Sequence, residues 1–304
     1  MKDFLYELRK NKVLFLMLIP AVLYFVVFSY IPMAGSVVAF KQFNYNQGIF
    51  GSPWNGFENF RFFFISGQAW KVTRNTFLYN IMFMVVGNIL QIALAIMLVE
   101  IRSKIFRKVS QTIMFLPYFI SWVVAGTFVY NLFNYEFGTI NTLLKSLGLQ
   151  PIDVYSNPSA WKYILLFFNN WKWVGYGSIV YLAAILGIDA ELYEAAQIDG
   201  AGVMSRIRRI TLPLLTPTII VLVLLNIGRI FRGDFDMFFQ LVGDSGNLFD
   251  ATNVIDTFVF RALMRNSDFA MASAAAFYQS VLCFGTILLV NFIIRKINKD
   301  YALF

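Results

Sequence analysis

Histidine is absent from the 304 residues of the chain, and cysteine occurs once, at Cys283. The absence of histidine removes the commonest metal ligand and the commonest general base of enzymes. A single cysteine excludes a disulfide framework within the chain. The sequence also lacks the phosphate-binding motif GxxxxGK[ST], the zinc motif HExxH and the hydrolase motif GxSxG. No metal site, cofactor site or catalytic site is therefore expected in this chain.

Charged residues are scarce as well. They make up 14% of the sequence, whereas 59% is hydrophobic and 18% is aromatic. A soluble domain has about 25% charged residues, so this chain lacks the polar surface that water requires. The formal net charge of +8 does not indicate nucleic-acid binding, because the basic residues gather at the ends of hydrophobic runs, where they match lipid headgroups. The composition predicts an integral membrane protein that contacts lipid and no nucleic acid.

Six hydrophobic runs are long enough to cross a bilayer, whose core of about 30 Å needs roughly 20 apolar helical residues. No internal repeat or low-complexity linker separates them. The sequence therefore predicts an all-α integral membrane protein with six transmembrane helices in a single transmembrane domain, residues 1–304. The runs are Val13–Phe40, Asn75–Val99, Val109–Phe133, Trp161–Ile188, Pro213–Phe231 and Phe269–Ile294.

The distribution of lysine and arginine predicts that both termini are cytoplasmic. The positive-inside rule assigns the side with more basic residues in short loops to the cytoplasm. Seven basic residues lie in the loops of the opposite side, although those loops are longer. The N-terminal tail and the loop after the second run hold four each, and the loop after the fourth run and the C-terminal tail hold three each: Lys2, Arg9, Lys10, Lys12, Arg102, Lys104, Arg107, Lys108, Arg206, Arg208, Arg209, Arg295, Lys296 and Lys299.

The predicted cytoplasmic segment 189–213 lies between two hydrophobic runs and contains acids, arginines and glycines. Its acids come early, which suits a helix dipole, and Gly200 and Gly202 favour a break in the chain. Pro213 fits the first turn of a new helix. The pattern predicts a helix, a sharp turn, a short helix and re-entry into the bilayer. This arrangement suits either the docking of a partner or a well-capped linker between two spans.

The spacing of this segment resembles the EAA motif of ABC-importer permeases. Glu194, Ala195 and Ala196 are followed after three residues by Gly200, and after nine more by Ile210-x-Leu212-Pro213. Further stretches are similar to the sugar-uptake, maltose-permease-like branch of this family: WNGFENF, FLPYFIS and WKWVGYGSIVYLAAILGIDAELYEAAQIDGAG. Two others, GDFDMFFQLVGDSG and RNSDFAMASAAAF, resemble permeases for oligosaccharides or polysaccharide fragments.

This resemblance implies a permease subunit, not an enzyme, in a bacterial inner membrane. Such subunits work with a second homologous permease, two ATPase subunits that bind ATP and Mg, and an extracytoplasmic solute-binding protein. The loop at about 189–213 is implied to be the coupling helix that an ATPase subunit receives. The residues implied in this contact are Glu194, Ala195, Ala196, Asp199, Gly200, Ile210, Leu212 and Pro213.

Polar and aromatic residues inside the runs are candidates for a substrate path. Asn88 and Gln91 share a helix face at i, i+3, with Asn80 about two turns earlier, and Tyr118 and Trp122 share one at i, i+4. Amides bond sugar hydroxyls and aromatic rings stack on sugar C–H faces. Each residue could instead bond a neighbouring helix or sit in an interfacial belt. The candidates are Asn88, Gln91, Tyr118, Trp122, Asn169, Asn170, Trp173, Tyr176, Asn226 and Arg229.

Charges gather after the fifth run, at Arg229, Arg232, Asp234 and Asp236. They suit either a polar gate or contact with a binding protein, or else mutual ion pairing. The two acids alone are too few for a metal site.

Three other functions come into question from the residues. A permease for another solute class, such as a peptide or a lipid-linked molecule, is possible because EAA loops occur across many importers. A membrane-embedded transferase needs an intramembrane acid/base or metal cluster. A secondary transporter acting alone needs inverted repeats or acids at mid-membrane, which the runs lack.

Overall fold

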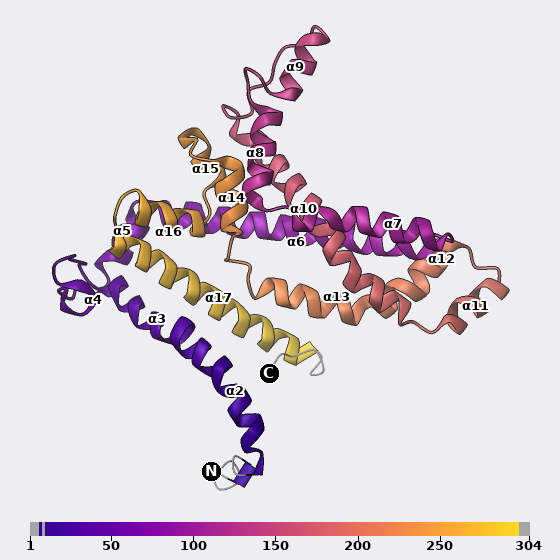
Figure 1. Cartoon of the computed structure of the whole chain (residues 1–304), viewed down its shortest axis with the longest axis horizontal. Helices are drawn as coiled ribbons and strands as arrows, with labels where there is room; N and C mark the ends of the chain where they lie inside the picture. Colours follow the sequence, from indigo (N-terminus) through magenta and orange to yellow (C-terminus); the bar gives the residue numbers. More distant parts are fainter. Residues whose placement is uncertain (1–5, 8–9, 298–304) are drawn as a thin grey trace. The chain divides into compact units, whose positions relative to one another are not determined.

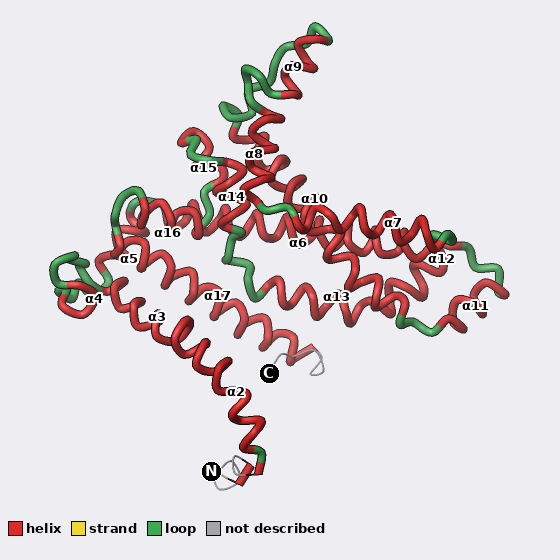
Figure 2. Tube along the Cα trace, viewed as in Figure 1, coloured by secondary structure: helices red, strands yellow, loops and turns green. Residues whose placement is uncertain are grey.

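The structure, a computed structural model, describes residues 6–7 and 10–297. Lys2, Arg9 and Lys299, which contribute to the predicted topology, lie outside these ranges. Within them every regular element is helical and no β-strand occurs (Figure 2), apart from one isolated antiparallel bridge between Lys41 and Trp54. The all-α prediction is confirmed for this part of the chain.

The chain separates into two compact units. The first comprises Met1–Ser66 and Val259–Phe277. The α-helix α2 buries none of its side chains, as expected of an apolar helix whose neighbours are lipid or another chain. Near the end of Met1–Ser66, the side-chain amide of Asn59 donates hydrogen bonds to the carbonyls of Ala39 (2.9 Å) and Lys41 (3.0 Å). The elements here are α2 (Lys12–Phe25), the π-helix η1 (Val26–Tyr30), α3 (Ile31–Met33), the 3₁₀-helix η2 (Ala34–Phe40), α4 (Gly48–Gly51) and α5 (Glu58–Ile65).

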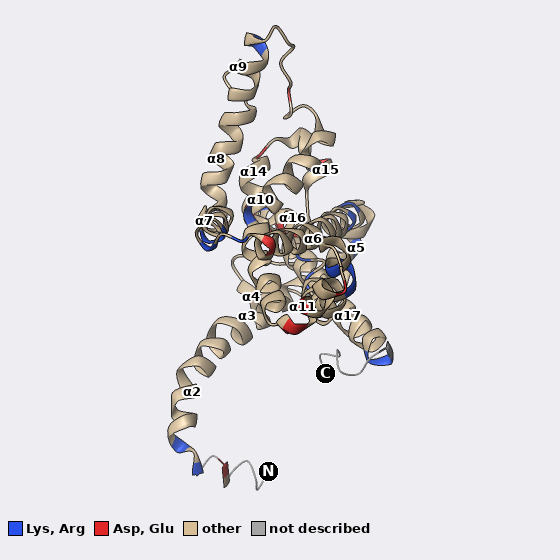
Figure 3. Ribbon diagram, turned by 90° about the vertical axis from the view of Figure 1, so that its right-hand side faces the viewer, with Lys and Arg blue, Asp and Glu red and all other residues tan. Residues whose placement is uncertain are grey.

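The second unit comprises Gly67–Phe258 and Tyr278–Phe304. Two helices, α16 (Ile255–Met264) and α17 (Phe269–Ile297), have residues in both units. Charged residues are sparse along the second unit. Basic residues lie in α7 and in the last turn of α17 (Figure 3). Its other elements are α6 (Gln68–Glu100), α7 (Lys104–Phe115), η3 (Leu116–Phe119), α8 (Trp122–Phe133), α9 (Thr139–Ser146), α10 (Pro158–Leu186), α11 (Ala190–Ile198), α12 (Val203–Arg206), η4 (Ile207–Thr211), α13 (Leu212–Ile227), α14 (Phe235–Val242), η5 (Gly246–Leu248) and α15 (Phe249–Thr252).

Packing of the second unit centres on α10, which lies alongside α6 (Figure 1). Trp161 and Tyr181 of α10 are fully buried, one in each of two apolar clusters. Gly175 allows α10 to approach α7 closely, because an added Cβ there would lie 1.8 Å from the carbonyl oxygen of Met114. The long helix α10 therefore forms the centre of the unit, with α6, α7, η3, α13, α14 and α15 around it.

Four helical segments are long and apolar enough to cross a membrane, or up to six if each of two bent pairs counts as one span. The four are Lys12–Phe40, Gln68–Glu100, Val203–Ile227 and Phe269–Lys296. The bent pairs are Lys104–Phe119 with Trp122–Phe133, at 94°, and Pro158–Leu186 with Ala190–Ile198, at 71°.

The break in the first bent pair corrects one prediction. Tyr118 and Trp122 do not share a face of one helix, because the chain turns between them. Pro117 lies in the 3₁₀ segment η3, Ile120 is extended, and the Ser121 hydroxyl caps α8 by accepting from Val124 N–H. A proline lacks the N–H that continues an α-helix, and serine is a favoured N-cap, so both residues favour the break.

The re-entry begins where it is predicted, but without a break before it. Pro213 lies in the first turn of α13, as predicted, and α12, η4 and α13 follow one another as one helical segment, Val203–Ile227. The stretch just before Pro213 is the π-helix η4, and a π-bulge changes the hydrogen-bond pattern to one in which the missing N–H of proline is tolerated.

Candidate functional site

A cavity of about 590 Å³ lies within the second unit, between α6, α10, α13 and the turn that joins α13 to α14. Five amide side chains line it, together with aromatic rings and three charged groups. A polar wall of this kind is unusual in such an apolar bundle, where polar side chains are costly and normally face protein or a water-filled space. The polar, aromatic and charged residues in the wall are Asn80, Asn88, Gln91, Asn169, Asn226, Phe83, Trp173, Tyr176, Arg229, Arg232 and Asp234.

The turn after α13 is held in place by three surrounding helices. Asn80 of α6 donates to the carbonyls of Ile230 (2.9 Å) and Arg232 (3.2 Å). From α17, Gln279 donates to the carbonyl of Phe231 at 2.8 Å. From α16, the carboxylate of Asp256 accepts from Gly233 N–H and from Gln279, and burial raises the pKa of Asp256. The backbone that carries the arginines is therefore fixed in position.

On α6, two amides face the cavity in defined positions. Asn88 accepts a 2.5 Å hydrogen bond from the hydroxyl of Tyr181 on α10, and donates to Met84 O in its own helix. The amide of Gln91 lies against the α10 backbone at Gly177, where an added Cβ would come within 2.3–2.5 Å of it. Gly177 therefore makes room for the Gln91 side chain at the cavity wall.

An aromatic cluster forms the opposite wall. Trp173 and Tyr176 of α10 line the cavity. Tyr118, from the broken helix, stacks on Tyr176 with ring centroids 4.4 Å apart and meets Trp173 edge-on at 5.5 Å. Stacked and edge-to-face rings stabilise each other and present a firm apolar face.

Behind this wall, Lys172 joins the broken helix to α10. Its ammonium donates to the carbonyls of Tyr118 (2.9 Å) and Ile120, and lies 5.3 Å from the centre of the Trp122 ring. Trp122 in turn donates through Nε1 to Asp234 Oδ2 at 3.0 Å. The buried lysine thus satisfies carbonyls that the break in the helix leaves without partners.

Seven of the ten predicted path residues line the cavity, namely Asn88, Gln91, Asn169, Trp173, Tyr176, Asn226 and Arg229. Tyr118 and Trp122 lie directly behind its wall through the contacts just described. Asn170 lies elsewhere: it is buried, donates to Leu166 O, and borders an apolar groove of about 720 Å³ between α6, α7 and α10. Neighbouring helix residues point about 100° apart, and here Asn169 lies on the cavity side of α10 while Asn170 lies on the side of the groove.

The charges after α13 do not pair with one another as the ion-pair alternative expects. Among the described residues, no carboxylate lies within ion-pair distance of Arg229 or Arg232. Asp234 caps α14 by accepting from Met237 N–H and bonds Trp122, and burial raises its pKa.

Three polar or charged cavity residues were not among the ten predicted path residues. Helical spacing pointed to Asn80, which lies two turns before Asn88. The sequence marked Arg232 and Asp234 as part of a charge cluster suited to a polar gate, but not as path residues, because they reach the cavity through a turn.

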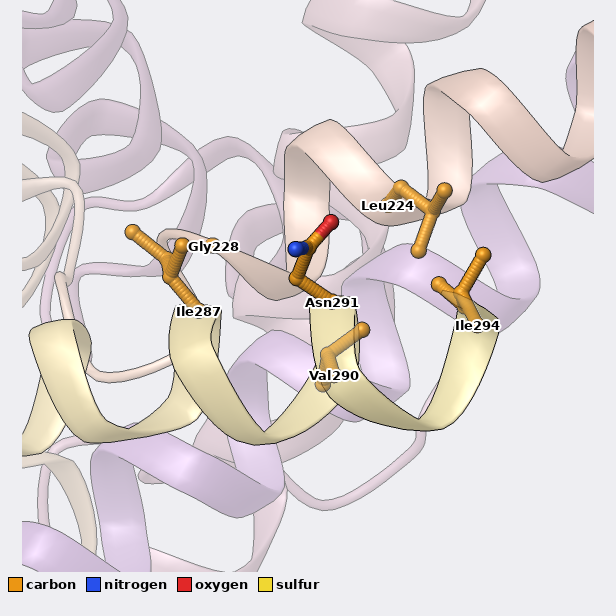
Figure 4. Close-up of a pocket in the computed structure, with 6 residues that line it drawn as sticks. All are labelled: Leu224, Gly228, Ile287, Val290, Asn291 and Ile294. Carbon is orange, nitrogen blue, oxygen red and sulfur yellow. The ribbon is translucent and has the colours of Figure 1, made fainter. Parts of the chain in front are cut away.

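A second, much smaller cavity lies between α13 and α17 (Figure 4). Its volume is about 10 Å³, which is the space of a single water at most. Gly228 lies against Ile287 there, with Asn291 pointing toward α13. This site is a packing contact. Within the described part of the chain, no group of three or more acidic or cysteine side chains could hold a metal ion.

The segment between α10 and α13 forms an elbow, residues 189–213. The Asp189 side chain caps α11 by accepting from Glu191 N–H. The helix ends at Asp199, and Gly200 adopts the left-handed conformation with φ of 78°. Ala201 N–H then bonds Ala196 O at 2.8 Å, which closes the turn in the manner of a Schellman cap. The predicted break at Gly200 is confirmed as local structure.

The elbow exposes apolar side chains and is braced from behind. Ile198 is 87% exposed and Met204 is 62% exposed, while Glu194 and Ala195 are also exposed. On the inner side, the hydroxyls of Tyr193 and Thr211 are 3.0 Å apart. Arg206 lies 3.9 Å from the carboxylate of Glu100, at the end of α6. The brace connects the elbow to the helix that carries Asn80, Asn88 and Gln91.

Comparison with protein families identifies one match. The model of the family described as "Binding-protein-dependent transport system inner membrane component" matches residues 87–299. This range contains the cavity lining except Asn80, Phe83 and Met84, and the whole elbow.

Two curated relatives from Bacillus subtilis (strain 168) align with nearly the whole chain. Protein LplB is 31% identical over 96% of this chain and 92% of its own length. The polygalacturonan/rhamnogalacturonan transport system permease protein YteP is 30% identical over 98% of this chain and 92% of its own length.

The fold is also present in solved structures. One chain of a bacterial ABC transporter involved in the import of the acidic polysaccharide alginate has a TM-score of 0.87 and 33% identity, covering 97% of this chain and 99% of that one. A chain of the alginate transporter in complex with its alginate pentasaccharide-bound periplasmic protein has a TM-score of 0.85 and 33% identity, covering 96% and 97%.

Proposed function

Because the chain belongs to the family of binding-protein-dependent transport system inner membrane components, we propose that it is a permease subunit of an ABC importer for oligosaccharides or polysaccharide fragments. The observation that carries the substrate class is the cavity of amides and aromatic rings within the helical bundle. Its volume of about 590 Å³ falls within the range of about 300–1,000 Å³ that is usual for ligand sites. Amides bond sugar hydroxyls, and Trp173 and Tyr176 offer faces for sugar rings.

In this proposal the chain is a single permease domain that crosses a bacterial inner membrane six times, with both termini in the cytoplasm. The bent pair Lys104–Phe119 with Trp122–Phe133 then counts as one span, and α10 is a span by itself, with α11 in the elbow outside the membrane. The excess of lysine and arginine at α7, the elbow and the end of α17 supports this orientation. At the break between Tyr118 and Trp122, the Lys172 ammonium bonds the Tyr118 and Ile120 carbonyls, which makes the irregular backbone compatible with a membrane.

The elbow is proposed to dock into an ATPase subunit. Ile198 and Met204 supply exposed apolar contact area, and exposed Ala195 allows close approach. Gly200 sets the bend, and the Tyr193–Thr211 and Arg206–Glu100 contacts transmit movement to α6 and α13. The coupling residues are Glu194, Ala195, Ala196, Asp199, Gly200, Ile210, Leu212 and Pro213.

The other components of the importer follow from this role. Two ATPase subunits bind ATP and Mg, a second homologous permease completes the transport path, and an extracytoplasmic solute-binding protein delivers the sugar. ATPase closure moves the elbow, and the cavity alternates in access between the two sides of the membrane. The path residues are those of the cavity wall, with Tyr118 and Trp122 supporting it.

Isolation of the assembled importer tests the proposal. The purified complex retains an ATPase, and a binding protein loaded with an oligosaccharide stimulates ATP hydrolysis, whereas Gly200→Pro releases the ATPase or uncouples hydrolysis from uptake. Stimulation by a peptide or a lipid-linked molecule in place of an oligosaccharide contradicts the substrate class. Transport without any ATPase contradicts the importer mechanism.

A further inference from the structure

The cavity wall carries two arginines, Arg229 and Arg232, that form no ion pair with any described carboxylate. Arg229 lies in the turn after α13, beside Asn226 and opposite Trp173 and Tyr176 in the lining. Its side chain makes no ion pair and no hydrogen bond within the described residues. Arg232 lines the same cavity and has no described carboxylate within ion-pair distance, although Asp256 attracts it from farther away.

The acids near these arginines are committed to other partners. Asp234 accepts from the Trp122 indole and from Met237 N–H. Asp256 accepts from Gly233 N–H and from Gln279. The two guanidinium groups therefore face the cavity with two full charges, against one carboxylate in the lining that is already hydrogen-bonded.

A guanidinium that lines a cavity without a partner binds an anion better than a neutral group. Arg229 and Arg232 are both exposed, so a ligand in the cavity can reach them. Charges among apolar helices are costly unless they are paired or face water. The planar guanidinium matches a carboxylate with two parallel hydrogen bonds, which a neutral hydroxyl cannot offer.

We propose that the cavity selects oligosaccharides that carry carboxylates, with Arg229 as the group that binds a uronic acid carboxylate and Arg232 as a second positive charge beside it. The inference rests on the proposed function and narrows its substrate class. The amides bond hydroxyls, the Trp173 and Tyr176 rings contact C–H faces, and Arg229 distinguishes an acidic sugar ring from its neutral counterpart.

The test compares short oligouronates with the same oligosaccharides after their carboxyl groups are reduced to primary alcohols. Each pair has the same length and linkage, so only the charge differs. Binding is measured directly on the purified importer without its binding protein, so that the selectivity of that protein does not contribute. The variants are Arg229→Gln, Arg229→Lys and the control Arg295→Gln, which removes an exposed positive charge at the end of α17.

The wild type and Arg295→Gln are expected to prefer the oligouronate by about 10- to 100-fold, the usual effect of a charged hydrogen bond. Arg229→Gln is expected to abolish this preference, and Arg229→Lys to retain part of it. Retention of the ATPase by each variant checks that it has folded. Equal binding of both sugars by the wild type, or an unchanged preference in Arg229→Gln, overturns the inference and leaves the proposed function standing. If no oligosaccharide binds or stimulates ATP hydrolysis, the proposed function fails instead.

Discussion

The left-handed glycine of the elbow makes a quantitative prediction. Gly200 has φ of 78°, and an alanine Cβ built there meets no heavy atom within 4 Å. The cost of Gly200→Ala is therefore conformational alone, about 1–2 kcal/mol for a side chain in the left-handed region. Gly202 is the matched control, because its φ of −67° suits any residue and its Cβ also meets nothing within 4 Å.

The first assay is amide hydrogen exchange at Ala201, whose N–H bonds Ala196 O only while the turn is closed. A penalty of about 1–2 kcal/mol accelerates exchange by roughly 5- to 30-fold in Gly200→Ala. The second is the ratio of sugar transported to ATP hydrolysed, which we expect to fall in Gly200→Ala and to stay unchanged in Gly202→Ala. Equal behaviour of the two alanine variants would refute the reasoning, since they differ only in backbone conformation.

Three further predictions concern the elbow and the cavity. Ile198→Asp places a charge on a side chain that is 87% exposed, so it should weaken ATPase retention without lowering the thermal unfolding midpoint. Lys172→Met leaves the Tyr118 and Ile120 carbonyls without their donor and should lower the free energy of unfolding by about 1–3 kcal/mol; an unchanged midpoint contradicts this role. Gly177→Ala should push the Gln91 amide away from α10 and weaken sugar binding while the complex stays assembled; unaltered affinity counts against Gln91 as a path residue.

Patterns local in the sequence predicted most of the helices. Long apolar stretches predicted the spans that the structure has at Gln68–Glu100 and Phe269–Lys296. Gly200, which follows α11, predicted a turn at that position, because glycine adopts the left-handed backbone conformation without a steric penalty. The spacing of three residues predicted that Asn88 and Gln91 share one face of α6, and both line the cavity.

Predictions that assumed a continuous helix were wrong where the helix is interrupted. The i, i+4 pairing of Tyr118 and Trp122 fails at the break after η3, yet both residues stay near the cavity through Tyr176 and Asp234. Pro213 does lie in the first turn of α13, but α13 follows the π-helix η4 without the break that the sequence suggested. Arg232 and Asp234 reach the cavity through a turn, where periodicity carries no information.

The sequence by itself determined that the chain is helical and membrane-embedded and that an elbow interrupts it at Gly200, because hydrophobic length, composition and glycine conformation are local properties. Only the tertiary structure decided which polar groups share a cavity. Contacts such as Asn80 with the turn at Ile230, Tyr181 with Asn88 and Lys172 with the broken helix join segments 54 to 150 residues apart. The packing of helices against each other decides such contacts, and no pattern within a single helix encodes them.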